Sequence, residues 1–324
     1  MVSLVLNNRG DEMGINKQTQ QKVFRAARKM NYKPNLLARG LRLGASKTLG
    51  LVIPNIGNYF FARIARVIED EAGKYGYRVM SVSSDEDPEK EVEMINVLIE
   101  RQVDGLILAS SQRDRSGIIR LRRENIPFVL IDRYFPKLAT NYVITDNYTA
   151  AYNVISHLID NGYKKIGLLK YTPSHLTPIR FRCEGYRNAL KDHGLRYSKA
   201  LVKEIPSGKI LETMQKALPE LLFKPVNADA LFFLNNDLTI AGLNVINGLG
   251  LRVPYDVAIV SFDDLELFKL LYPPVTAVAQ PWQDMARHAV RILINELDGS
   301  SGSAQKEHIV LPASLEIRRS SSRF

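Results

Sequence analysis

The alternation of short apolar runs with amphipathic segments, which begins at residue 49, constrains the fold more than any other feature of the sequence. Strand-length runs rich in Val, Ile and Leu cover residues 49–54, 79–83, 105–109, 128–132 and 142–145. Segments 60–75 and 88–101 lie between them and carry apolar residues at helical spacing. Buried strands that alternate with helices predict a parallel sheet with helices on both faces.

The same pattern restarts after residue 145. We expect helices over residues 151–161, 182–193, 211–222 and 239–249, and strands over 166–170, 200–205, 230–234, 257–262 and 275–279. At 324 residues the chain is too long for one ordinary core, whereas two doubly wound sheets fit its length. The predicted α/β fold would leave a cleft at the carboxyl ends of the strands, where small ligands bind in open α/β folds.

The composition is that of a soluble protein, with 45% hydrophobic and 24% charged residues. No apolar run reaches the roughly 18 residues that a membrane span requires. The first residues lack the basic start and the cleavage site of a secretory signal. The single cysteine, Cys183, cannot form an internal disulfide. We therefore expect a protein of the cytoplasm with no membrane contact.

Positive charge is concentrated at the N-terminus. The first 48 residues hold ten Lys and Arg but only Asp11 and Glu12, so they carry most of the formal net charge of +10. This asymmetry favours an anionic partner at the N-terminus. A basic tail that only improves solubility would produce the same asymmetry.

Residues 16–31 predict a helix with one apolar and one basic face. Asn16 is a suitable N-cap, and Pro34 disfavours helical geometry in the residue before it. The apolar face is expected to consist of Val23, Ala26, Ala27 and Met30. Lys and Arg crowd the other side, where plain solvation is the commoner role of charged residues.

Four strings of residues resemble the headpiece and hinge of the lactose-repressor (LacI) family of transcriptional regulators. They are VSLVLN at 2–7, TQQKV at 19–23, MNYKPN at 30–35 and ARGL at 38–41, and the resemblance continues to the last strand. It implies a DNA-binding headpiece (residues 1–33) that starts within the recognition helix and lacks the preceding helix and turn, then a hinge helix and linker (34–48). An effector-binding domain (49–324) of the periplasmic-binding-protein type follows, with one subdomain of residues 49–145 and 280–311 and another of 146–279 and 312–324.

The resemblance also implies which residues contact DNA. They are Ser3, Asn7, Lys33, Asn35, Arg39, Leu41 and Arg42. Leu41 matches the family's hinge leucine, which wedges into the minor groove and bends the duplex. Gly40 stands where a Ser or Ala is more usual and should weaken the isolated hinge helix by about 1 kcal/mol. Without the resemblance, an amphipathic linker patch would be the preferred interpretation of this segment.

Eight positions match the family's effector site. They are Tyr59, Phe60, Ser111, Arg133, Asp146, Arg182, Asn236 and Asp263. A forked guanidinium and a carboxylate engage adjacent sugar hydroxyls, and an aromatic ring covers the apolar sugar face. Ordinary structural roles are the alternative: helix caps for the aspartates, core positions for the aromatics and a surface ion pair for the arginine. Leu176 and Pro178 stand where purine-binding members carry polar groups, so a purine effector is disfavoured.

The expected function is a sequence-specific DNA-binding repressor whose operator affinity is controlled by a small effector, most consistent with a sugar. We expect a homodimer on a pseudo-palindromic operator. The alternative is a periplasmic-type sugar-binding protein of a transporter, which would share the whole body. The five histidines are scattered, and no nucleophile, acid–base pair or phosphate-binding motif is recognisable, so neither an enzyme nor a cofactor or metal site is expected.

Overall fold

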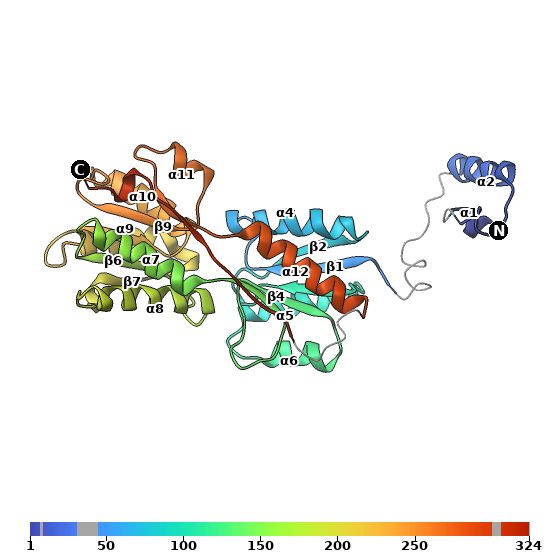
Figure 1. Ribbon diagram of the computed structural model, residues 1–324, viewed down its shortest axis with the longest axis horizontal. Helices are drawn as coiled ribbons and strands as arrows, with labels where there is room; N and C mark the ends of the chain where they lie inside the picture. Colours follow the sequence, from blue (N-terminus) through green and yellow to red (C-terminus); the bar gives the residue numbers. More distant parts are fainter. Residues whose placement is uncertain (7–8, 31–44, 300–305, 324) are drawn as a thin grey trace. The chain divides into compact units, whose positions relative to one another are not determined.

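The computed structural model describes residues 1–6, 9–30, 45–299 and 306–323, and the chain divides into a unit of Met1–Lys47 and a unit of Thr48–Phe324 (Figure 1). Among these described residues, no helix combines the length and the apolar character that crossing a bilayer demands.

The first unit contains two helices that pack together, α1 (Val2–Leu6) and α2 (Lys17–Lys29). The predicted N-cap is confirmed, because the Asn16 side chain accepts a hydrogen bond from the backbone amide of Gln18 at 2.8 Å. The predicted apolar face is only partly correct. Val23 and Ala27 are half-buried, but Ala26 is exposed and Met30 is 72% exposed, because the short α1 covers only part of α2.

The second unit begins with a parallel six-stranded sheet, here called the first sheet. Its order is β11-β5-β4-β3-β1-β2, with β1 (Thr48–Ile53), β2 (Arg78–Ser83), β3 (Gly105–Leu108), β4 (Phe128–Ile131), β5 (Tyr142–Thr145) and β11 (His308–Leu311). Helices α4 (Tyr59–Lys74) and α12 (Trp282–Leu297) pack together on one face, and α5 (Pro88–Glu100) and α6 (Ser116–Arg123) cover the other (Figure 1). The five strands predicted before residue 146 are confirmed.

A second six-stranded sheet has the order β12-β10-β9-β8-β6-β7. Its strands are β6 (Ile166–Thr172), β7 (Val202–Pro206), β8 (Ala230–Phe233), β9 (Ala258–Phe262), β10 (Thr276–Ala279) and the antiparallel β12 (Ser314–Glu316). Its helices are α7 (Asn147–Asp160), α8 (Thr177–Asp192), α9 (Ile210–Leu222), α10 (Asn236–Gly248) and the short α11 (Glu266–Leu270). The predicted α/β class with two mainly parallel sheets is thus confirmed.

The predicted starts of four elements in this half were wrong by two residues or more. Helix α7 begins at Asn147 instead of residue 151, because the side chain of Asp146 caps it. Helix α8 begins at Thr177 instead of residue 182, since Pro178 fits the first turn of a helix. Helix α10 begins at Asn236 instead of residue 239, because the Asn235 side chain caps it by accepting from the Leu238 amide at 2.9 Å. The strand expected from residue 200 begins at Val202, after a 3-10 turn at Lys199–Leu201.

The chain passes between the two sheets three times, after β5, after β10 and between β11 and β12 (Figure 1). At the first two crossings, the Thr145 hydroxyl donates to the side-chain oxygen of Gln280 at 2.7 Å. A few parallel connections of this kind allow one half to rotate against the other while each sheet stays intact.

Gly185 is required by the close packing of α7 against α8. A Cβ atom at this position would lie 2.4 Å from the backbone oxygen of Tyr148 and 2.9 Å from the backbone nitrogen of Tyr152. Backbone atoms cannot move aside cheaply, so Gly185→Ala is expected to lower the free energy of unfolding by about 1–3 kcal/mol. Urea denaturation measures this loss.

Gly73 supplies the matched control, because a Cβ atom there would meet nothing within 4 Å. Gly73→Ala lies near the end of α4 and should leave stability unchanged or raise it by up to about 1 kcal/mol. Equal effects of the two substitutions would contradict the packing argument.

Candidate effector-binding cleft

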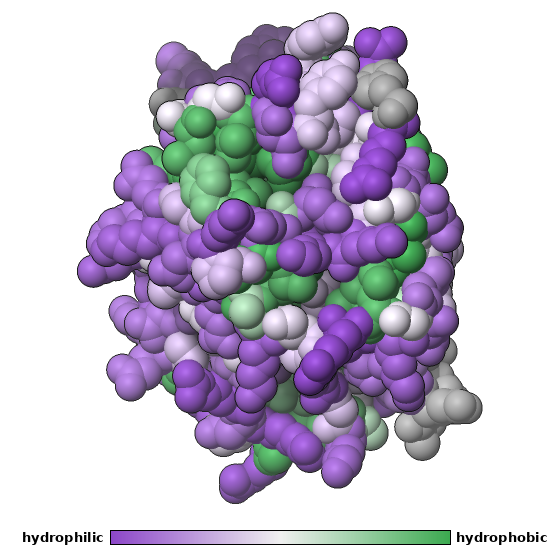
Figure 2. Space-filling view, turned by 90° about the vertical axis from the view of Figure 1, so that its left-hand side faces the viewer, coloured by the Kyte–Doolittle hydropathy of each residue, from purple (hydrophilic) through white to green (hydrophobic). Residues whose placement is uncertain are grey.

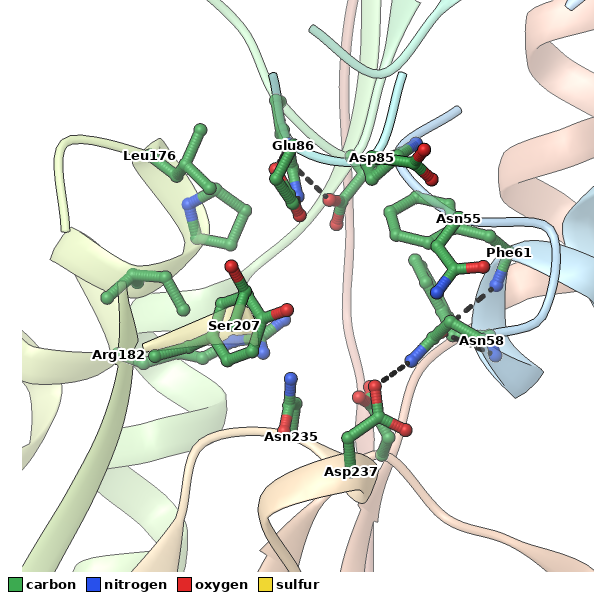
Figure 3. A pocket seen from close by; sticks show the side chains of 18 of the residues that line it. Asn55, Asn58, Phe61, Asp85, Glu86, Leu176, Arg182, Ser207, Asn235 and Asp237 are labelled. Carbon is green, nitrogen blue, oxygen red and sulfur yellow. Dashed lines mark hydrogen bonds and ion pairs between the residues drawn. The ribbon is translucent and has the colours of Figure 1, made fainter. Parts of the chain in front are cut away.

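A cavity of about 230 Å³ lies between the two sheets at the carboxyl ends of their strands (Figure 3). It is lined from the first-sheet half by Pro54, Asn55, Asn58, Phe60, Phe61, Asp85, Glu86, Asp132 and Arg133, from the second-sheet half by Tyr171, Leu176, Pro178, Ile179, Arg182, Ser207, Gly208, Asn235, Asp237 and Asp263, and at a crossing by Gln280. Its aromatic, amide, carboxylate and guanidinium groups are those that bind a polyhydroxylated molecule.

Arg182 is fixed in the wall of this cleft by contacts on three sides. It lies on α8 and is only 4% exposed. Its Nε donates to Asn147 at 2.7 Å, its Nη1 donates to the backbone oxygen of Leu234 at 2.6 Å, and its guanidinium carbon lies 3.5 Å from the centroid of the Phe262 ring. Nη2 makes no hydrogen bond within the described residues. Arg182 therefore offers a rigidly held donor for a ligand hydroxyl.

Two buried aspartates, Asp132 and Asp263, line the cleft just after the ends of strands β4 and β9. Asp263 follows β9 and accepts a 2.5 Å hydrogen bond from Gln280, and Asp132 follows β4. Burial raises the pKa of both carboxyls, although the charges of Arg182 and Arg133 act against this shift. Oδ1 of Asp132 has no hydrogen-bond partner among the described residues. This oxygen is therefore a buried, unsatisfied acceptor of a residue that lines the cavity.

The raised pKa of Asp132 sets an expected pH dependence. A carboxyl whose pKa is higher in the folded state than in the unfolded state contributes stability below its unfolded pKa of about 3.9, and this stability is lost as pH rises through the folded pKa. Asn cannot ionise, so Asp132→Asn avoids the loss of stability at neutral pH. Asn also tolerates the positive φ of 64° at this position. We expect a higher melting temperature at pH 7 and no gain below about pH 4.

The exposed Asp256 is the control for this measurement, because its hydrogen bonds with Arg252 lower its pKa. Asp256→Asn should bring no gain at pH 7. A gain from Asp132→Asn that is the same at both pH values would contradict the assignment.

An ion pair between Arg133 and Glu86 backs the cleft. Nη2 of Arg133 lies 2.6 Å from Oε1 of Glu86, Nη1 lies 2.8 Å from Oε2, and the Ser111 hydroxyl donates to Oε2 at 2.9 Å. Burial acts to raise the pKa of Glu86, but the charge and hydrogen bonds of Arg133 and the bond from Ser111 outweigh it and leave the pKa lowered. Both groups are charged and mutually neutralised, so Arg133 is not free to hold an anionic ligand.

Asn58 connects the two halves directly. Its side-chain oxygen caps α4 by accepting from the Phe60 amide at 3.1 Å. Its Nδ2 donates across the cleft to Asp237 at 2.9 Å and to Asn236 at 3.1 Å, both on α10 (Figure 3). The cleft is thus closed by a polar contact that depends on the angle between the halves.

Four of the eight residues predicted from the sequence line the cavity: Phe60, Arg133, Arg182 and Asp263. Ser111 lies behind the wall on the Arg133–Glu86 pair, and Asn236 is buried beside Asp237, where it accepts from Asn58. The residues that the sequence did not single out include Asn58 and Asp132. Asp132 is the last residue of the predicted strand 128–132, and ligand-binding residues of α/β folds lie at such carboxyl ends, so this signal could have identified it.

Tyr59 and Asp146 lie elsewhere. Tyr59 precedes Phe60 on α4 and therefore points about 100° away. It lines a neighbouring pocket that shares Phe60, Asp263 and Gln280 with the cleft, and Arg63 donates to its hydroxyl at 2.7 Å. Asp146 is the N-cap of α7, and its carboxylate accepts from the Thr149 amide at 3.0 Å. Both have ordinary structural roles here, because local helix geometry fixes where they point.

The predicted DNA contacts lie almost wholly outside the described residues. This holds for Asn7, Lys33, Asn35, Arg39, Leu41 and Arg42, and for Pro34 and Gly40 of the predicted helix end and hinge. Ser3 lies on α1.

Comparison with known proteins identifies relatives over nearly the whole length. Residues 155–321 match the periplasmic binding protein-like domain. The HTH-type transcriptional regulator DegA of Bacillus subtilis is 32% identical over 99% of this chain and 94% of its own.

Two solved structures are similar in fold and contain sugars. The transcriptional regulator CelR in complex with cellobiose is 27% identical with a TM-score of 0.76, over 98% of this chain and 94% of that one. The periplasmic binding protein/LacI transcriptional regulator of Alkaliphilus metalliredigens in complex with D-xylulofuranose is 26% identical with a TM-score of 0.72, over 85% and 98%. The chain therefore belongs to the LacI family of HTH-type transcriptional regulators, as its similarity to these proteins, its two-sheet fold and its two N-terminal helices show.

Proposed function

We propose that this protein is a cytoplasmic transcriptional repressor whose affinity for operator DNA is controlled by an uncharged sugar or sugar derivative in the cleft. The observation that carries the proposal is the cavity whose walls come from both halves and whose donors and acceptors suit hydroxyl groups. Similar folds hold cellobiose and D-xylulofuranose. The site residues are Phe60, Arg133, Arg182 and Asp263, supported by Ser111 and Asn236.

The cleft charges favour an uncharged effector. Glu86 neutralises Arg133, and Arg182 faces the carboxyls of Asp132 and Asp263, so no cationic side chain of the described cleft wall is left for a phosphate or carboxylate. The remaining charged groups of the lining, Asp85 and Asp237, repel anions.

Ligand control would act through the angle between the halves. We propose subdomains of residues 49–145 with 280–311 and 146–279 with 312–324, and a ligand that contacts both favours the closed arrangement by its differential affinity. The basic segment of the first 48 residues leads into β1, an inner strand of the first sheet that pairs with β2 and β3. Closure in a homodimer would then change the separation of two DNA-binding segments on a pseudo-palindromic operator.

A homodimer also has surface available. Hydrophilic side chains dominate the end of the molecule in Figure 2, with hydrophobic side chains gathered in areas between them. Leu270 is 81% exposed and Tyr272 is 93% exposed in the second-sheet half. These two residues lie close together in the sequence, and we propose them as part of a surface that contacts a second chain.

The competing assignments have less support. A periplasmic-type sugar-binding protein would share the body, but the curated relative DegA is a DNA-binding regulator over 99% of this chain. An enzymatic function has less support because the proteins that match the chain are transcriptional regulators.

Titration of one sugar into the protein alone and into its complex with operator DNA tests the function. Linkage requires that DNA changes the sugar affinity by the factor by which sugar changes the DNA affinity, and we expect roughly 5- to 150-fold. Calorimetry measures the first factor and fluorescence anisotropy the second. Identical sugar affinities in both titrations would show that the cleft does not regulate DNA binding.

A further inference from the structure

A second cavity, here called the basic pocket, adjoins the effector cleft. It has a volume of about 310 Å³, within the range of small-molecule sites. Its charged or titratable lining consists of Arg113, Arg115, Arg133, Lys137, His175 and Arg180, and no carboxylate lines it. The effector cleft, by contrast, is lined by five carboxylates: Asp85, Glu86, Asp132, Asp237 and Asp263.

Arg133 is paired with Glu86, but four other cations of the basic pocket, Arg113, Arg115, Lys137 and Arg180, have no anionic partner within the described residues. The side chains of Arg113, Arg115 and Lys137 make no hydrogen bond or ion pair within the part of the chain that the structure describes. Among the described residues, the guanidinium of Arg180 contacts an aromatic ring and no carboxylate, with its guanidinium carbon 5.0 Å from the centroid of Phe181. All four side chains are exposed to solvent, and their like charges gathered around one cavity create a positive potential that attracts an anion.

Helix α8 begins at this pocket and adds to its positive potential, because its N-cap residue, Leu176, makes no side-chain cap. An uncapped helix N-terminus favours a bound phosphate or carboxylate, although Pro178 in the first turn of α8 has no N–H to donate. Helix α6 adds less, because the carboxylate of Asp114 accepts a hydrogen bond from its first amide, that of Ser116, at 2.9 Å. Tyr134, Phe135 and Pro136 supply an apolar wall beside these donors, which suits an organic body attached to the anion.

The basic pocket spans both halves of the protein. Arg113, Arg115 and Lys137 follow strands of the first sheet, whereas His175 and Arg180 lie at the start of α8. Two contacts already join the halves here: His175 Nε2 lies 3.1 Å from the backbone oxygen of Ser111, and the Tyr134 amide donates to the Thr177 hydroxyl at 3.3 Å. An anion between these walls would favour the closed arrangement, as an effector in the cleft would.

We propose that the basic pocket binds a phosphate monoester of a small metabolite and thereby strengthens sugar binding in the adjoining cleft. The protein would then combine two signals, an uncharged sugar and a phosphorylated metabolite. The site itself does not depend on the proposed function, although its coupling to the sugar does.

Calorimetry with ribose 5-phosphate, ribose and inorganic phosphate at low ionic strength tests the site. Ribose 5-phosphate should bind the unaltered protein, more tightly than inorganic phosphate, and its affinity should fall as salt is added. In the double variant Arg113→Gln with Arg180→Gln, the affinity should fall by about tenfold or more, because two charge-assisted hydrogen bonds are lost. Arg122→Gln removes an exposed cation of α6 that does not line the pocket and should leave the affinity unchanged.

Arg182→Ala separates the two sites, because it alters the effector cleft and leaves the basic pocket intact. Retention of ribose 5-phosphate binding in this variant supports the proposal, whether or not the cleft binds a sugar. Loss of binding in Arg182→Ala with retention in the double variant would overturn it. So would equal binding of ribose or of inorganic phosphate, an equal loss in Arg122→Gln, or no binding of ribose 5-phosphate by the unaltered protein.

Discussion

Replacing Arg133 with methionine is expected to lower the free energy of unfolding by about 3–5 kcal/mol, because the substitution leaves the carboxylate of Glu86 buried without its partner. The side chains of this pair are only 9% and 11% exposed, so water cannot compensate. Urea denaturation followed by circular dichroism measures the loss.

The double variant Arg133→Met with Glu86→Gln removes both charges and should recover much of the stability. As a control, Arg120→Met breaks an exposed pair with Glu124, whose side chains are 46% and 43% exposed, and should cost less than about 1 kcal/mol. Equal losses in the single and double variants would show that the uncompensated charge is not the cause.

Arg182→Ala is expected to weaken sugar binding by about 2–4 kcal/mol, which is a loss of affinity of roughly 30-fold or more. The reason is that Arg182 lines the cavity and is held in place by Asn147, Leu234 and Phe262, while its Nη2 makes no hydrogen bond within the described residues. Calorimetry with a sugar chosen from a panel of uncharged mono- and disaccharides measures the change.

Circular dichroism and thermal unfolding must first show that the Arg182→Ala protein is folded. Arg252→Ala removes an arginine whose side chain is 74% exposed and should leave the sugar affinity as it was. A folded Arg182→Ala protein with unaltered affinity would exclude Arg182 from the site.

The sequence predicted the strands well because they are buried on both faces. In β3, β4 and β8 every residue is buried, so each strand is a continuous apolar run between polar segments. Helix starts were harder to predict, because they depend on caps and first turns rather than on periodicity. The first turn of α8 contains Thr177 and Pro178, which resemble a loop in sequence.

Site residues could be predicted from the sequence where a single residue type indicates the chemistry. They could not be predicted where the site depends on a contact between residues far apart in the sequence. Arg182 and Asp263 follow from residue type and family position. The contact of Asn58 with Asp237 joins residues 179 positions apart and exists only at the angle between the halves that the structure adopts. No pattern in the sequence encodes that angle. The same reason explains why the basic pocket, built from three separate segments, was not predicted.

Hydrogen exchange of the backbone amides, measured with and without saturating sugar, tests most directly whether the ligand bridges the two halves. Residues 55–61 and 176–182 form opposite walls of the cleft. If one sugar contacts both walls and favours closure, exchange should slow in both segments together and stay unchanged in α2. Slower exchange in one wall alone, or in neither, would contradict the proposal that a sugar held between the two sheets controls this protein.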